Sequence, residues 1–424
     1  NAYNVAIGYG VGRNITTGVQ NTLIGGLTGD ALNIGEKNVT LGYASLGSDT
    51  AGAKSTAIGY AALNAQNFTT ATDSFNVAVG HEAGGAVTTG IRNTIVGALA
   101  GDALTDADLN VVMGYNALSS DTLGSGAVAI GQGALNTQNF TTATTSYNVA
   151  VGYNAGGGTT TGVRNSIVGG IAGDSLTVGG NNVSMGYASL SADTQGSGSV
   201  AIGAGALNVQ NFTTATTTYN VAVGLDAGKA TTTGIRNTLI GGLAGDALTD
   251  ADRNVALGYA ALSSDTLGSR SVAIGNSALF YQNFTTATDT YNIAIGDRAG
   301  NNVTTGSQNT LIGGLAGNAL TTASENTAVG YLALSSEDAN GLNTALGNRT
   351  LATLNAGANG YNVAVGHYAG TAMTTGINNT LIGGLAGDAL TDADSNVAVG
   401  YNSLSKNTLG SACTAVGSGA LFAH

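Results

Sequence analysis

Proline and tryptophan are absent from the 424 residues, cysteine occurs once, and charged residues make up only 8%. The lone Cys413 excludes a disulfide within the chain. Lysine and arginine number 12 against 24 aspartates and glutamates, which gives a formal net charge of −12. This balance disfavours nucleic acid and anionic membranes as partners, because both bind basic patches. No apolar run approaches the roughly 18–20 residues of a membrane-spanning helix, so we expect no membrane insertion.

Glycine is plentiful, with 68 residues, and much of it recurs at a fixed spacing. The pentapeptide Asn76-Val77-Ala78-Val79-Gly80 returns along the whole chain in related forms. Its glycine stands at positions 8, 25, 42, 59, 80, 97, 114, 131, 152, 169, 186, 203, 224, 241, 258, 275, 296, 313, 330, 347, 366, 383, 400 and 417. The gaps read 17, 17, 17 and 21, which makes a set of 72 residues, and the fifth set is shorter because its last gap is 19. Such a period indicates a repeat architecture.

Each repeat reads as one turn of a solenoid. The residue before the glycine is always aliphatic or Met, and the third residue before it is Val, Ile, Thr or Ser, with mostly Ala between them. This alternation predicts a short strand with one buried face, and 17 residues are too few for a strand plus a packed helix. We therefore predict an all-β, parallel β-solenoid (β-roll) of 24 coils, each with two short strands and two bends. The prediction is a single elongated solenoid over 1–424, with repeat sets 4–75, 76–147, 148–219, 220–291, 292–361 and 362–424.

Two positions beside the strand are nearly invariant. Asparagine stands four residues before the glycine in nineteen of the twenty-four coils. Stacked coils would align these amides, which predicts a hydrogen-bonded ladder along the axis. The third residue after the glycine is small, as at Ala83 and Ser189, which predicts a crowded bend. The exceptions to the asparagine are Ser55, Ala127, Ser199, Ser271 and Cys413.

The second coil of every set carries a large apolar residue where the other coils mostly have Ala. We expect this side chain to point away from the core of its own coil. A bulky apolar residue that recurs on the outside suggests a subunit interface. The alternative is a broader internal core. The candidate interface residues are Leu23, Ile95, Ile167, Leu239, Leu311 and Leu381.

The fourth coil of the first four sets carries four extra residues. Insertions in solenoids emerge on one face, which is often the binding face. These loops are our candidate surface-binding sites, and the alternative is that they latch subunits together. Their leading residues are Gln66, Asn67, Phe68, Thr69, Gln138, Asn139, Phe140, Thr141, Gln210, Asn211, Phe212, Thr213, Gln282, Asn283, Phe284 and Thr285.

Aspartates at alternate positions invite a calcium hypothesis, since calcium prefers oxygen ligands. Other sets lack them, so we favour a solvated turn and expect no cofactor. No His, Cys or carboxylate cluster has metal-site spacing, and no nucleophile is paired with a recurrent base, so we expect no enzyme. The calcium candidates are Asp106, Asp108, Asp250, Asp252, Asp392 and Asp394.

The motif resembles known repeat families. Ser-Val-Ala-Ile-Gly at 199–203 and 271–275 is similar to the repeats of trimeric autotransporter adhesin heads. Asn-Thr-Ala-Val-Gly-Tyr at 326–331 resembles repeats common in bacteriophage tail-fibre-like proteins. The adhesin resemblance implies a left-handed β-roll that assembles as a parallel homotrimer and binds host surfaces. The unit of 17 or 21 residues is longer than the adhesin head repeat, and no coiled-coil stalk is present.

Our leading functional prediction is a rigid, trimeric fibre segment that presents repeated weak sites to a host surface polysaccharide or protein. We favour an extracellular phage tail fibre over a bacterial surface adhesin, because of the second repeat form. A self-assembling filament is an alternative, since neither end carries an evident cap and we expect further protein beyond both ends. An ice-binding solenoid is a weaker alternative, because Thr-Thr pairs occur only about once per four coils.

Overall fold

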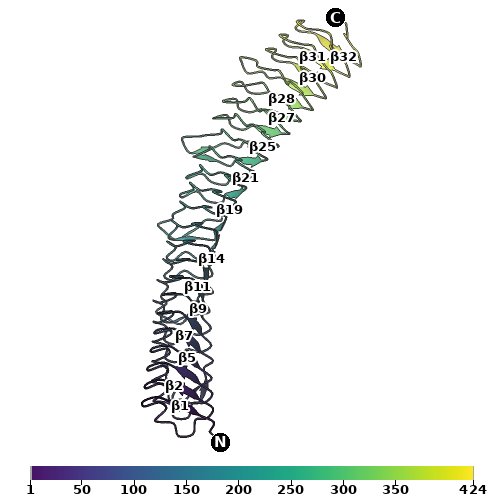
Figure 1. Ribbon diagram of the computed structural model, residues 1–424. Coiled ribbons are helices and arrows are strands. Elements are labelled where there is room, and N and C mark those ends of the chain that lie inside the picture. The colour runs from purple at the N-terminus through teal and green to yellow at the C-terminus, as the bar shows by residue number, and fades with distance from the viewer. Residues whose placement is uncertain (1, 424) are drawn as a thin grey trace. The chain divides into compact units, whose positions relative to one another are not determined.

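The computed structural model describes residues 2–423, which contain strands, turns and bends and no helix. The chain divides into two compact units, Asn1–Thr218 and Tyr219–His424. Each unit is a parallel β-solenoid of twelve turns, which confirms the predicted fold class. Figure 1 shows the strands of each unit stacked one upon the next. Among the described residues there is no helix that could cross a membrane.

One three-residue strand per turn builds the main sheet of each unit. In the first unit the strands are β1 (Val5–Ile7), β2 (Thr22–Ile24), β3 (Val39–Leu41), β5 (Thr56–Ile58), β7 (Val77–Val79), β8 (Thr94–Val96), β9 (Val111–Met113), β11 (Val128–Ile130), β13 (Val149–Val151), β14 (Ser166–Val168), β15 (Val183–Met185) and β17 (Val200–Ile202). In the second unit they are β19 (Val221–Val223), β20 (Thr238–Ile240), β21 (Val255–Leu257), β23 (Val272–Ile274), β25 (Ile293–Ile295), β26 (Thr310–Ile312), β27 (Thr327–Val329), β28 (Thr344–Leu346), β29 (Val363–Val365), β30 (Thr380–Ile382), β31 (Val397–Val399) and β32 (Thr414–Val416).

The strands pair in parallel with identical motif positions side by side. Val77 lies beside Thr94, and Ala78 lies beside Ile95. The same alignment spans the 21-residue turn, where Thr56 pairs with Val77. The extra residues of that turn therefore leave the strand column without disturbing its register.

The two faces of each strand are the reverse of what we predicted. In every strand of the main sheet except β1, whose three residues are all exposed, the middle residue is buried and its two neighbours are half-buried or exposed. Ile95, for example, has no exposed surface, whereas Met113 is 45% exposed. The expected outward direction of the six candidate interface residues was therefore wrong. Side chains inside the solenoid are not available to another subunit. The six, all with 0% exposure, are Leu23, Ile95, Ile167, Leu239, Leu311 and Leu381.

These large residues fit inside because a glycine follows four residues after the motif glycine. A Cβ added to Gly245 would lie only 2.8 Å from Leu239 Cδ2, so the missing side chain leaves the space that Leu239 fills. Many turns with a small middle residue carry a buried leucine at that later position instead, as Ala57 does with Leu63. The first turn of each set has Ala with Gly, as at Ala78 and Gly84, and there Ile95 and Leu63 of the adjacent turns fill the space. The core of a turn is thus filled by its own large side chains or by those of the adjacent turns, and close packing favours such exchanges.

A second strand forms only around the long turns, not in every turn as predicted. The four short pairs are β4 (Gly52–Ala53) with β6 (Thr72–Asp73), β10 (Gly124–Ser125) with β12 (Thr144–Thr145), β16 (Gly196–Ser197) with β18 (Thr216–Thr217), and β22 (Gly268–Ser269) with β24 (Thr288–Asp289). In the 17-residue turns the corresponding backbone bends sharply. There the amides of Thr88 and Gly90 both donate to the carbonyl oxygen of Thr105, which breaks the regular ladder.

The motif glycine marks a corner where two turns touch. Gly241 has φ +135°, and a Cβ there would lie 2.3 Å from the carbonyl oxygen of Gly258 in the next turn. Only glycine combines that backbone conformation with so close an approach.

Candidate functional site

The candidate binding loops are half interior and half surface. In each loop the Gln and the Phe are buried, and the Asn and the following Thr are exposed. Gln66 has no exposed surface and Phe68 is 6% exposed, whereas Asn67 and Thr69 face solvent. The same division holds for Gln138 to Thr141, Gln210 to Thr213 and Gln282 to Thr285. Any binding by these loops would therefore use Asn and Thr, because Gln and Phe anchor the loop from within.

A buried carboxylate at Asp49 holds the first of these loops. Its Oδ1 accepts the backbone N–H of Gly52 at 2.9 Å and of Phe68 at 3.1 Å. Its Oδ2 accepts the side-chain amide of Gln66 at 2.6 Å. The same three contacts recur around Asp121, which has no exposed surface either. The insertion is thus fastened to its own chain by these buried contacts, and its exposed Asn and Thr take no part in them.

Gln66 also takes the place of a missing ladder asparagine. In ordinary turns Asn93 Nδ2 donates to the carbonyl oxygen of Ala107 at 2.7 Å, and Asn93 Oδ1 accepts the N–H of Asn110 at 3.0 Å. The ladder therefore runs mainly from side chain to backbone, rather than from amide to amide as we predicted.

In the long turn the asparagine is replaced by Ser55. Gln66 donates to Ser55 Oγ at 2.9 Å and accepts from Asn76 Nδ2 at 2.9 Å. The glutamine of the insertion thereby connects the ladder across the turn that lacks its asparagine.

The fifth set solves the same problem with different residues. Its fourth turn keeps the ladder residue Asn343, and the position of Gln66 is taken by the buried Leu354. Its loop is two residues shorter, and the position of Asp49 is taken by Glu337. The longer side chain reaches the N–H of Ala356 with Oε2 at 3.1 Å. The pair Ser55 and Gln66 and the pair Asn343 and Leu354 are therefore two alternative ways to fill the same space in the interior.

Burial dominates the electrostatics of these carboxylates. Desolvation raises the pKa of Asp49 and of Asp121, and the hydrogen bonds from Gln66 or Gln138 and from the backbone oppose this only in part. Desolvation likewise raises the pKa of Glu337, against hydrogen bonds from Ala356 and Asn340. No cation faces these groups within salt-bridge distance among the described residues, so backbone and amide N–H groups supply the stabilisation of the charge.

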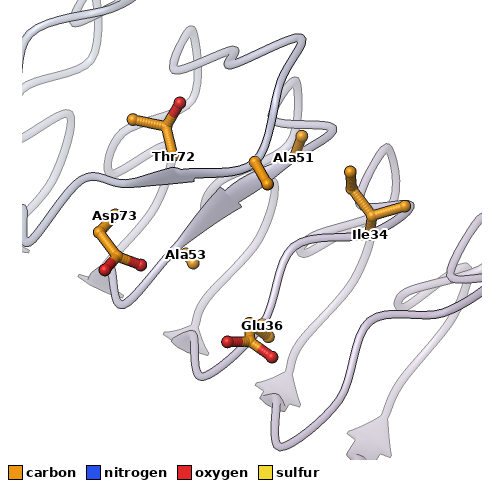
Figure 2. A pocket seen from close by; sticks show the side chains of 7 residues that line it. Ile34, Glu36, Ala51, Ala53, Thr72 and Asp73 are labelled. Atoms are coloured by element: carbon orange, nitrogen blue, oxygen red, sulfur yellow. The ribbon is translucent and has the colours of Figure 1, made fainter.

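A trough of about 620 Å³ lies beside the loop of the first set. Figure 2 shows its side chains, which come from three successive turns. Alanines line the trough, and two carboxylates, Glu36 and Asp73, stand at its edge. The full lining is Ile34, Glu36, Ala51, Ala53, Ala71, Thr72 and Asp73.

The chain itself shows why this trough is open. The position of Ala51 holds Leu123, Gln195 and Leu267 in the next three sets, and these side chains are half-buried. Ala51 is small where these three counterparts are large, so a leucine at this position would fill part of the trough that Ala51 lines. The sequence contained this signal as two small residues, Ala51 and Ala339, at a position that holds a large residue in the other four sets.

Both carboxylates of the trough are paired with lysines. Lys37 Nζ lies 2.6 Å from Glu36 Oε1, and Lys54 Nζ lies 2.6 Å from Asp73 Oδ2. Lys54 also lies over the ring of Phe75, at 4.9 Å from the centroid. The rim of the trough thus presents two ammonium–carboxylate pairs, which together carry no net charge.

The outer face of the main sheet is apolar. The two outward residues of each strand are Val, Ile, Leu, Met, Thr or Ser in every turn, and none is charged. Leu41 and Leu257 are 48% and 43% exposed. The sequence analysis did not predict this apolar outer face. The alternation shows which residues lie on the same side of the strand, but it does not show which side faces the interior.

The six calcium candidates act as turn residues that hold the preceding turn. Asp106 accepts the hydroxyl of Thr89 at 2.6 Å, and Asp108 accepts the N–H of Ile91 at 2.7 Å. Asp250 and Asp252 repeat these contacts at 2.6 and 2.8 Å. Asp392 likewise accepts the hydroxyl of Thr375, and Asp394 accepts the N–H of Ile377 at 2.8 Å. Between residues 2 and 423 no three His, Cys, Asp or Glu side chains gather closely enough to hold a metal ion.

Comparison with protein-family models, with curated proteins and with solved structures finds no match to this chain.

Proposed function

We propose that the chain is a rigid segment of an extracellular fibre that associates side by side as a homotrimer and presents repeated weak binding sites. The observation that carries this proposal is the uncharged, apolar outer face of the main sheet. Twelve strands at about 4.8 Å spacing extend this face over about 58 Å in each unit. The cores of protein interfaces are depleted of charge in the same way, and long apolar surfaces of soluble proteins mark contact sites.

A second copy of the chain is the partner that this face fits best. Its outward residues recur at every turn, so a parallel copy presents the same residues at the same spacing. A lattice of identical apolar columns favours self-association over a partner with another period. The resemblance to adhesin-head and tail-fibre repeats supports three copies, and a tail fibre of a virion is the setting that we favour over a bacterial cell surface.

Repetition along the fibre and across subunits would increase binding by avidity. Sites that are individually weak gain when several engage one surface together, provided that the spacing between them is fixed. The exposed Asn and Thr residues of the four long loops, including Asn67 and Thr69, recur at such fixed intervals. A host-surface polysaccharide or protein is the partner class that this arrangement suits.

Native mass, measured by light scattering after size-exclusion chromatography, tests the association. We expect a mass of three chains for the unaltered protein. Met113→Glu and Leu257→Glu each place a charge on the outer face, one in each unit, and together they should yield single chains. Thr213→Glu and Thr285→Glu, on exposed loop positions, form the matched control and should leave the mass at three chains. A single-chain mass for the unaltered protein would disprove the trimer, and a long polydisperse species would favour the filament.

Ice binding is a second candidate, because the threonines are more regular than the Thr-Thr pairs indicated. Eight residues after the motif glycine, three of four turns carry Thr in the second, third and fourth sets, as at Thr88, Thr105 and Thr122. Several hydroxyls are already used, since Thr105 Oγ1 donates to the carbonyl oxygen of Thr122 at 3.0 Å. The column is also only one residue wide. A thermal hysteresis assay tests this candidate, and a protein solution without thermal hysteresis would disprove ice binding.

A further inference from the structure

We infer that the trough of the first set binds a neutral saccharide. The inference deepens the proposed function, on which its multivalent use rests, by assigning a ligand class to one place on the chain. The volume of about 620 Å³ is that of a small-molecule site. The trough is formed by one copy of the chain, so binding there does not itself require association.

The lining has two chemically distinct parts. Ile34 and Ala71 supply an exposed apolar surface, and Ala51 and Ala53 line the trough with only 4% and 5% of their surface exposed. Glu36, Asp73 and the hydroxyl-bearing Thr72 supply polar groups, and Figure 2 shows Ala53 between the two carboxylates in that view. A sugar ring has the same two parts, with C–H groups on its faces and hydroxyls at its edge.

The charges at the rim favour a neutral ligand over an ionic one. Each carboxylate is already paired with a lysine at 2.6 Å, so an added ion would have to displace a partner of its own sign. A hydroxyl both donates and accepts hydrogen bonds. It can donate to Glu36 or Asp73 and accept from Lys37 or Lys54 without breaking either pair, and hydrogen bonds to charged groups are the stronger ones.

Ala51 distinguishes the site from its counterparts in the second, third and fourth sets. The fifth set has Ala339 at this position but lacks the charged rim, because Ser324 and Leu342 correspond to Glu36 and Lys54. Leu267 occupies the equivalent position in the fourth set, where Asp252, Arg253, Arg270 and Asp289 correspond to the four charged residues at the rim. Arg270 Nε lies 2.8 Å from Asp289 Oδ1, as Lys54 pairs with Asp73. The fourth set therefore has the polar rim, but a leucine stands where the first set has open space.

Saturation-transfer NMR with glucose, galactose, mannose, N-acetylglucosamine and lactose tests the inference. Glucuronic acid and spermidine serve as charged comparison probes. At least one neutral sugar should receive saturation from the unaltered protein, and Ala51→Leu should abolish the transfer. Leu267→Ala should add a second site and increase the transfer. Glu36→Ala should weaken binding about tenfold, as expected for one lost hydrogen bond to a charged group.

Several outcomes overturn the inference. They are no transfer to any neutral sugar, the same transfer from Ala51→Leu, or transfer to glucuronic acid or spermidine alone. Circular dichroism confirms that Ala51→Leu is folded, and Glu36→Ala provides the test if it is not. The native mass of each variant separates the two proposals, because sugar binding to single chains would support this site while disproving the trimer.

Discussion

Two corners of each turn behave differently. The strand corner, from the ladder asparagine to the motif glycine as in 76–80, keeps its length and geometry in every turn. The insertion corner, as in 66–72, has 17-, 21- and 19-residue versions and several side-chain solutions. At the strand corner the constraint is contact between the backbones of successive turns, and this contact leaves no choice of residue at the motif glycine. At the insertion corner the constraint is only that buried polar groups find partners, and different residues satisfy it.

The largest expected effect comes from breaking the strand corner. Gly241→Ala would place a Cβ 2.3 Å from the carbonyl oxygen of Gly258 at φ +135°. Backbone strain together with overpacking predicts a loss of about 4 kcal/mol in local stability. Because repeat proteins unfold in parts, the measurement is hydrogen exchange at the amides of β20 and β21.

Gly417→Ala is the matched control for this change. Gly417 also has positive φ, at +125°, but the nearest atom to its added Cβ is that of Ala420 at 3.9 Å. The control carries the conformational cost without the clash, so it should be clearly milder. Equal losses at the two positions would show that φ alone, and not the contact between turns, explains the invariant glycine.

The next effect is at the insertion corner. Asp49→Ala removes the acceptor of the Gly52 and Phe68 amides and of the Gln66 side chain, all in the interior. Buried donors left without partners predict a loss of about 3 kcal/mol. The loss should appear as faster hydrogen exchange at Gly52 and Phe68, with β7 and the strand column unchanged. Loss of protection along the main sheet as well would contradict the independence of the two corners.

The strand column could be predicted from the sequence, and the interior side of the strand could not. Period-two alternation shows that Val77 and Val79 share a face and that Ala78 has the other. To decide which face is the interior, one must consider all the large side chains of a turn together. The useful signal was that one turn pairs Leu239 with Gly245, whereas another pairs Ala57 with Leu63. Where the middle residue is Leu or Ile, the fourth residue after the motif glycine is always Gly, which indicates that both positions lie in the same core.

The candidate site was located only to the level of the loop. The repeated Gln-Asn-Phe-Thr identified the insertion, but the sequence does not state that Gln66 replaces an asparagine eleven residues earlier. That signal was present, because Asn343 appears where Leu354 replaces the glutamine. The trough depends on Ala51, whose importance appears only when the neighbouring turns are placed beside it.

A double-mutant cycle sharpens the comparison within the insertion corner. Ser55→Asn crowds Gln66, and Gln66→Leu leaves Asp49 and Ser55 without their amide donor. The double variant Ser55→Asn with Gln66→Leu reproduces the pair Asn343 and Leu354 of the fifth set. We expect the two changes to offset each other by about 1–2 kcal/mol, as contacting residues do. The measurement is hydrogen exchange at Phe68 in the four proteins, and additive losses would contradict the exchange of fillings.

The smallest effect expected is the pH dependence of the insertion corner. Burial raises the pKa of Asp49, Asp121 and Glu337 in the folded chain above their unfolded values. Between the unfolded and the folded pKa, the folded state therefore binds more protons than the unfolded state. The contribution of these groups to stability is full below the unfolded pKa, and it is lost as the pH rises through the folded pKa. Acidification from pH 7 into that window should therefore slow exchange at Phe68 and Phe140. Asp49→Asn with Asp121→Asn should remove this response at the two loops while leaving that at Ala356, because an amide does not titrate and Glu337 is retained. A faster exchange at lower pH, after correction for the intrinsic rate, would show that the hydrogen bonds to the carboxylates outweigh their burial.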